Sequence, residues 1–309
     1  MNTNPTSQPH YIDLRVTPEV AHEPDDLLKA LATYLGLFSN QISDYKVIKR
    51  SIDARARQIK YQLRIAYFLE GENVVWSNPQ PKTYQQVDDQ SPSVLIIGSG
   101  PAGLFAALKL LELGLKPIII ERGKDVRARR RDLAKINKDH VVNPESNYCF
   151  GEGGTGTYSD GKLYTRSGHK KVIKDILHTF VKFGAQEDIL VDAHPHIGTN
   201  KLPNIITNMR ETIIKYGGEV HFDSLMTDII MDRKTFKGIQ INGDKKMYAE
   251  ACILATGHSA RDIFYLLESR NIKIEFKTFA MGVRVEHPQS LIDQIQYKTP
   301  VRGEYLPPS

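Results

Sequence analysis

The sequence predicts an α/β protein in which a parallel sheet with helices on both faces and a β-meander follows a small α+β domain. Residues 94–97 and 116–120 are nearly continuous apolar runs, as expected of parallel strands buried on both faces. Residues 101–113 between them repeat apolar side chains at helical spacing, and Gly114 provides a helix stop. Ahead of this unit, residues 59–69 alternate apolar and polar side chains, as a half-exposed strand does.

The composition and the expected elements divide the chain at a linker. Residues 1–75 form the predicted α+β domain, in which Pro24 opens a helix. Residues 76–92 are rich in Pro, Gln, Ser and Asp and form the expected linker. The main sheet and its helices begin at Ser93.

The stretch "GSGPAG", residues 98–103, joins the first buried strand to its helix. Gly98 permits the tight turn, Gly100 lets the backbone approach a pyrophosphate, and Gly103 lets helix and strand pack closely. The helix N-terminus offers free N–H groups and a positive dipole end to phosphates. Glu121 ends the second strand, where a carboxylate accepts hydrogen bonds from ribose hydroxyls. We therefore predict a Rossmann-like dinucleotide site; this turn does not separate FAD from NAD(P).

Charged residues cluster at the end of the second buried strand. Removal of the Glu121 carboxylate is expected to weaken cofactor binding by about 1–3 kcal/mol. Little change in stability is expected, on the premise that a strand-end acid lies outside the core. Arg122 follows directly and is placed to reach a phosphate or the adenine. The other arginines of "RGKDVRARRR", residues 122–131, are expected on a solvent-exposed helix.

The stretch "NYCFGEGGTGTYSDGKLYTR", residues 147–166, concentrates five glycines within eleven residues. We call these eleven residues, 151–161, the glycine loop. Such a segment is neither regular helix nor strand, so it is a flexible linker or a loop whose backbone N–H groups wrap a ligand. Its flanking aromatic side chains favour burial and therefore the ligand loop. Further along, an expected meander returns to a buried strand that ends in "ATG", residues 255–257.

These motifs together resemble those of the two-dinucleotide-binding flavoproteins. More narrowly, "FGEGGTGTYSDGKLYTR", "ILATGHSARD" and "FAMGVRVEHPQ" resemble a bacterial family of uncharacterised FAD-dependent dehydrogenases. The resemblance covers most of the chain, including the N-terminal unit with "KRSIDAR". It implies a Rossmann-like FAD-binding fold for residues 93–265 and an incomplete substrate domain for residues 266–309.

The resemblance implies a tightly bound, extended FAD. Its pyrophosphate would rest on residues 98–103, its ribose on Glu121, and its isoalloxazine end on the loop of residues 153–162. The adenine would pass Met226, and the dinucleotide would pass residues 255–257. The expected cofactor-binding residues are Gly98, Ser99, Gly100, Pro101, Ala102, Gly103, Glu121, Arg122, Gly153, Gly154, Thr155, Gly156, Ser159, Lys162, Met226, Ala255, Thr256 and Gly257.

Three further residue types carry weaker signals. Lys162 is suited to stabilise a reduced flavin, while a phosphate contact or a surface position explains it as well. His194 and His196 have the spacing of two metal ligands, but no third ligand cluster accompanies them, so no metal site is predicted. Cys149, beside the glycine loop, is expected to pack rather than to act in redox chemistry. No catalytic residue is assigned.

These features predict an FAD-dependent oxidoreductase that moves a hydride or electrons between FAD and a small-molecule substrate. NADPH or NADH is a candidate electron donor. Similarity of this kind gives the cofactor and not the substrate.

Two alternatives stay open. One is an FAD-associated RNA-modification or RNA-binding protein, suggested by the basic stretch from Lys46 to Arg64, which otherwise forms a solvated sheet face or docks the second domain. The other is an NAD(P)-only Rossmann protein, which the glycine loop disfavours.

The composition of the 309 residues is that of a globular protein with a mild net charge of +5, and nucleic acid is not expected as a partner. No apolar stretch reaches the roughly 18 residues of a membrane span, and the N-terminus lacks the features of a signal peptide. Cys149 and Cys252 are far apart and form no C-x-x-C pair, which favours a reducing cytoplasm.

Members of the resembled family continue well beyond "EHPQ", so the sequence is expected to be an N-terminal portion of a longer protein. It has no later glycine-rich turn of the kind that such folds place near the flavin ring. We therefore expect that these residues alone do not sustain turnover. Residues beyond about 288 are expected to be loosely packed for want of partners.

Overall fold

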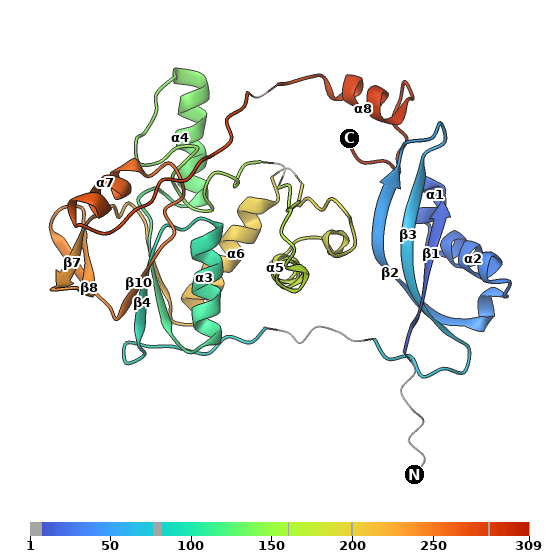
Figure 1. Ribbon diagram of the computed structural model, residues 1–309, viewed down its shortest axis with the longest axis horizontal. Coiled ribbons are helices and arrows are strands. Elements are labelled where there is room, and N and C mark those ends of the chain that lie inside the picture. Colours follow the sequence, from blue (N-terminus) through green and yellow to red (C-terminus); the bar gives the residue numbers. More distant parts are fainter. Residues whose placement is uncertain (1–7, 77–81, 160, 199, 284, 309) are drawn as a thin grey trace, which may run out of the picture.

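The computed structural model describes residues 8–76, 82–159, 161–198, 200–283 and 285–308. Figure 1 shows an N-terminal unit beside a larger unit built on a parallel sheet. The predicted fold class is confirmed, since the parallel sheet, its helices and the meander all follow a small α+β unit.

The N-terminal unit is a three-stranded antiparallel sheet, in the order β1-β3-β2, packed on two helices. Apolar side chains at alternate positions of β3, among them Leu63 and Ile65, point into a core that contains Leu31 of α2. The period-two pattern of the sequence is thus the buried face of a strand. The elements are β1 (His10–Val16), α1 (Pro18–His22), α2 (Pro24–Leu35), the 3₁₀ helix η1 (Ser39–Gln41), β2 (Ile42–Asp53) and β3 (Lys60–Leu69).

The larger unit contains a parallel sheet in the order β10-β4-β5-β6 and an antiparallel meander in the order β7-β8-β9. Its strands are β4 (Ser93–Ile97), β5 (Lys116–Ile120), β6 (Glu219–His221), β7 (Met226–Asp232), β8 (Thr235–Ile241), β9 (Lys245–Tyr248) and β10 (Ala251–Leu254). Its helices are α3 (Pro101–Glu112), α4 (Val126–Asp139), α5 (Lys170–Lys182), the 3₁₀ helix η2 (Glu187–Leu190), α6 (Leu202–Lys215) and α7 (Arg261–Ser269).

Both faces of β4 and β5 are covered, which explains their unbroken apolar runs. Ile96 and Ile119 face a core with α3 and α6. Leu95 and Ile118 face a second core with the meander and α7. The sheet is therefore fixed from both sides, and the carboxyl ends of β4, β5 and β10 meet at one edge, where open α/β sheets bind ligands.

The C-terminal segment packs on the N-terminal unit, contrary to the expectation that residues beyond about 288 are loose. Helix α8 (Gln289–Tyr297) and the residues after it return to the sheet of that unit (Figure 1). Tyr297 is 3 % exposed and Leu306 is 9 % exposed, both within the core that holds Leu63. The expectation is wrong because these residues find apolar partners more than 200 positions away, which sequence spacing does not reveal. Residues 273–283, which lead to α8, are exposed throughout.

Arg50 of the basic stretch joins the two units. Its backbone N–H donates to the Val191 carbonyl at 2.8 Å, and its side chain pairs with Asp192 at 2.7 Å and Asp188 at 2.8 Å. Arg55 in the same stretch pairs with Asp53 at 2.8 Å. Docking of the second domain, one of the open interpretations, therefore accounts for Arg50, and neither guanidinium is without an acidic partner.

Candidate cofactor site

A cavity of about 480 Å³ opens at the carboxyl ends of β4, β5 and β10. Its size lies in the range of small-molecule and cofactor sites. Both glycine motifs of the sequence reach it, although about 50 residues separate them in the chain. The cavity is lined by Ile97, Gly98, Gly100, Pro101, Ala102, Ile120, Glu121, Arg122, Cys149, Phe150, Gly151, Gly154, Thr155, Gly156, Ser224, Leu225, Met226, Leu254, Ala255, Thr256, Gly257, Ala260 and Ile263.

The turn between β4 and α3 shows why its glycines stand where they do. At Gly98, φ is +106°, and a Cβ would lie 2.5 Å from the Ala255 carbonyl oxygen. A Cβ at Gly103 would lie 2.0 Å from the Gly98 carbonyl oxygen. Gly100 differs, because a Cβ there would have no neighbour closer than Gly154 Cα at 3.9 Å. Gly98 and Gly103 are thus required by close backbone packing, whereas Gly100 leaves space open in front of α3.

The cavity also offers backbone donors. Gly100 is the N-cap of α3 and supplies no side-chain cap. In the described part of the chain, the amides of Gly100, Ala102, Thr155 and Gly156 have no hydrogen-bond partner. Unpaired amides at a helix N-terminus attract anions, and the helix dipole adds to this. The open space at Gly100 and these donors fit the pyrophosphate of a dinucleotide.

The glycine loop is tied directly to the turn. The Gly153 amide donates to the Ser99 carbonyl at 2.9 Å, which brings the loop against the start of α3. This is why Gly153 and Ser99 support the cavity without lining it. Ser159 closes a local turn through its hydroxyl, which donates to the Gly156 carbonyl at 2.7 Å.

Glu121 connects three segments at the carboxyl-end edge of the parallel sheet. The residue is only 4 % exposed. Its carboxylate accepts four hydrogen bonds, from the Ser99 amide and hydroxyl, the Gly123 amide and the Gly151 amide, at 2.8 to 3.0 Å. These donors belong to the turn, to the end of β5 and to the glycine loop. The premise that Glu121 lies outside the core is therefore wrong, because the carboxylate holds three buried segments together.

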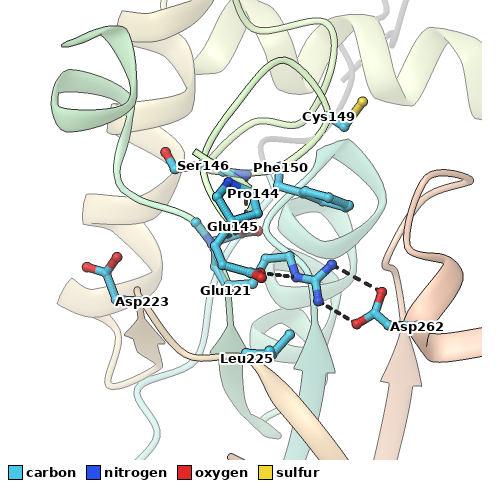
Figure 2. A network of polar contacts seen from close by, with 12 residues as sticks. Glu121, Pro144, Glu145, Ser146, Cys149, Phe150, Asp223, Leu225 and Asp262 are labelled. Atoms are coloured by element: carbon cyan, nitrogen blue, oxygen red, sulfur yellow. Dashed lines mark hydrogen bonds and ion pairs between the residues drawn. The ribbon is translucent and has the colours of Figure 1, made fainter. Parts of the chain in front are cut away.

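Arg122 lines the cavity but is engaged with protein groups. Its Nε lies 3.0 Å from Glu145, its other guanidinium nitrogens contact Asp262 of α7, and the guanidinium lies 4.5 Å from the centre of the Phe150 ring. Figure 2 shows Glu145 and Asp262 joined to the same guanidinium from opposite sides. Arg122 thus fixes the wall between α7 and the glycine loop, and any contact with a phosphate would come in addition to these partners.

Glu152 is a buried carboxyl that the sequence did not single out. Its Oε2 accepts a hydrogen bond from the Val126 amide at 2.8 Å, and its Oε1 lies 3.4 Å from Nε of Arg210. Burial raises the pKa of Glu152, and the carboxylates of Asp125 and Glu121 act in the same direction. The hydrogen bond from Val126 and the charge of Arg210 oppose this rise in pKa and are outweighed.

The raised pKa of Glu152 predicts a pH-dependent stability. A carboxyl whose pKa is raised in the folded state stabilises the fold fully below its unfolded-state pKa and loses that contribution as pH rises through the folded-state pKa. The non-ionising Glu152→Gln variant should therefore gain stability relative to the parent as pH rises from acid to neutral. Urea unfolding across that range measures the difference, with exposed Glu211→Gln as control. A difference that does not vary with pH would contradict the assignment.

Most of the predicted cofactor residues meet at the cavity. Thirteen of them line it: Gly98, Gly100, Pro101, Ala102, Glu121, Arg122, Gly154, Thr155, Gly156, Met226, Ala255, Thr256 and Gly257. Ser99, Gly103, Gly153, Ser159 and Lys162 do not. Lys162 is exposed and forms a β-bridge with His196, and its place beside a flavin stays a prediction.

Other lining residues were missed by the sequence reasoning. Ile97, Ile120 and Leu254 end the three strands, and a signal for them was available in the apolar runs themselves.

Cys149 is exposed and lines the cavity, so the expectation that it packs in the interior is wrong. Burial raises the pKa of Cys252 to about 11, which keeps that thiol protonated. Across the described ranges, no three His, Cys, Asp or Glu side chains come together as metal ligands.

Comparison with known families assigns most of the chain. A family described as pyridine nucleotide-disulphide oxidoreductase matches residues 92–280. A family described as FAD-dependent protein, C-terminal domain-like, matches residues 278–309, and a domain of unknown function matches residues 8–68. Within the described residues, no helix is both long and apolar enough to cross a bilayer.

An uncharacterised protein of Clostridium beijerinckii is 38 % identical over 289 residues, which are 88 % of this chain and 53 % of that protein. The chain thus spans about half the length of this curated relative. Among solved structures, THI4 of Thermovibrio ammonificans is 17 % identical with a TM-score of 0.39, covering 59 % of this chain and 64 % of that one. Glycine oxidase of Bacillus cereus is 16 % identical with a TM-score of 0.31, covering 59 % of each chain. These structural similarities are too weak to add to the family match.

Proposed function

This chain belongs to the pyridine nucleotide-disulphide oxidoreductase family, and on that premise we propose that it uses bound FAD to move a hydride or electrons to or from a small-molecule substrate. The observation that carries the proposal is the cavity where the glycine turn, the glycine loop and the "ATG" strand end meet. FAD supplies the redox chemistry in such proteins, while the protein supplies binding, orientation and electrostatics. NADPH or NADH is the electron donor that we propose.

In this proposal, different residues of the cavity bind different parts of FAD. The amides of Gly100 and Ala102, with those of Thr155 and Gly156, hold the pyrophosphate. The adenosine lies toward Glu121 and Met226, and residues 255–257 flank the dinucleotide. Glu121 acts through the segments it orders, since its carboxylate already accepts four hydrogen bonds.

We place the protein in the cytoplasm, because Cys149 and Cys252 are free thiols, which suits a reducing compartment. We divide the chain into an N-terminal unit to residue 75, a linker, an FAD-binding unit of residues 93–265, and a segment of residues 266–309. The end of that last segment shares the core of the N-terminal unit.

The test is a flavin titration followed by anaerobic reduction. The purified chain, freed of ligand, should take up FAD with a shifted visible flavin spectrum, and NADPH or NADH should then bleach the bound flavin. A chain that takes up no FAD at saturating concentration would overturn the proposed function. Uptake of FAD without bleaching by either nucleotide would overturn the proposed electron donor and leave the cofactor site standing.

A further inference from the structure

Arg129 lies on α4, within the basic run that the sequence places on a solvent-exposed helix, yet it is 1 % exposed. Among the residues that the structure describes, no carboxylate forms an ion pair with it. This burial lowers the pKa of Arg129, because the charged form is removed from water. A buried cation is costly unless hydrogen bonds replace its hydration.

The glycine loop and the residues directly before it supply these hydrogen bonds. The guanidinium donates to backbone carbonyls along residues 147–154 and to one hydroxyl, so that the chain is wrapped around it. Its partners are the carbonyl oxygens of Asn147 at 2.9 Å, Tyr148 at 3.1 Å, Gly151 at 3.3 Å, Glu152 at 2.8 Å and Gly154 at 2.8 Å, and Oγ1 of Thr157 at 3.1 Å.

The same contacts require glycine in the loop. At Gly151, φ is +116°, and a Cβ would lie 2.4 Å from Cδ of Arg129. Gly153 and Gly154 also have positive φ, at +81° and +69°. The loop therefore follows a backbone path that non-glycine residues rarely adopt, and the guanidinium collects the carbonyl groups along it. Thr155 and Gly156, whose amides are unpaired in the described structure, directly follow the last carbonyl that Arg129 holds.

We propose that Arg129 is the positioning residue that shapes the glycine loop for the cofactor, so that the affinity for FAD depends on a guanidinium that does not itself line the cavity. The proposal rests on the proposed function, since it concerns the same site. The hydrogen-bond partners of Arg129 all lie at residues 147–157, outside the strands of the parallel sheet, so the sheet should persist when the loop loses its anchor.

The helix provides its own control. Arg130 follows Arg129 directly and is exposed, so Arg130→Ala removes the same charge from the same helix. FAD titration by flavin fluorescence should show Arg129→Ala binding about thirtyfold more weakly than the parent, and Arg130→Ala within about twofold. Guanidinium chloride, at concentrations far below those that denature, should restore affinity to Arg129→Ala in a saturable way. Sodium chloride at equal ionic strength should not restore it.

The outcomes separate the two proposals. A parent chain that fails to bind FAD overturns the proposed function. A parent that binds FAD, together with Arg129→Ala matching Arg130→Ala or gaining nothing from guanidinium, overturns the role of Arg129 alone. Should Arg129→Ala fail to fold by circular dichroism, Arg129→Lys decides the question, because it keeps the charge and loses the planar fork. About tenfold weaker binding supports the role, and parental affinity overturns it.

Discussion

Gly100→Val is expected to abolish FAD binding in a chain that remains folded. The backbone at Gly100 has φ −69° and ψ −178°, which valine adopts without strain. A Cβ there meets no protein atom closer than 3.9 Å, so the substitution leaves the packing of the apoprotein nearly unchanged. The added side chain instead fills the space before the α3 N-terminus, where the pyrophosphate would lie. We expect affinity to fall at least about a thousandfold, or about 4 kcal/mol.

The measurement pairs a flavin titration with urea unfolding of the apoprotein. Gly168→Val is the matched control, because Gly168 lies outside the cavity and a Cβ there meets nothing within 4 Å. The control should keep parental affinity, and both variants should unfold within about 1 kcal/mol of the parent. A folded Gly100→Val protein with full flavin content would show that the pyrophosphate does not pass this turn.

Glu121→Ala is expected to lower both stability and FAD affinity. The substitution leaves the buried amides of Ser99, Gly123 and Gly151 without their acceptor. Each unsatisfied buried donor costs about 1–3 kcal/mol. Partial relaxation of the loops reduces the sum, so we expect the free energy of unfolding to fall by about 3–5 kcal/mol. FAD should bind more weakly as well, because the turn and the glycine loop lose their common anchor.

Glu211→Ala serves as the control for this effect. Glu211 is an exposed carboxylate on α6, and its removal should change the free energy of unfolding by less than about 0.5 kcal/mol. Urea unfolding of the two apoproteins gives the comparison, and a flavin titration gives the affinities. Equal free energies of unfolding would mean that the Glu121 carboxylate does not hold the three segments together.

The parts of the fold that the sequence predicted are those set by local pattern. The apolar runs of β4 and β5 indicate strands covered on both faces, and the cores on either side bear this out. The glycine turn was recognisable because a strand and a helix of the right length flank it. Both glycine motifs were predicted to serve one cofactor, and both line the same cavity.

What the sequence did not reveal depends on pairing between distant residues. Arg129 stands in a run of basic residues, and only the tertiary contacts distinguish it from exposed Arg130. The burial of Glu121 follows from donors on the turn and the glycine loop, which spacing along the chain does not bring together. Lys162 forms a β-bridge with His196 and does not line the cavity, and no local pattern in the sequence predicts that bridge.

The central claim is that one FAD molecule lies in the cavity with its pyrophosphate between the α3 N-terminus and the glycine loop. A crystal structure of the chain grown with FAD tests this most directly. We predict phosphate oxygens within hydrogen-bond distance of the Gly100 and Ala102 amides on one side and of the Thr155 and Gly156 amides on the other. An FAD whose phosphates lie elsewhere, with these four amides open to solvent, would contradict the account.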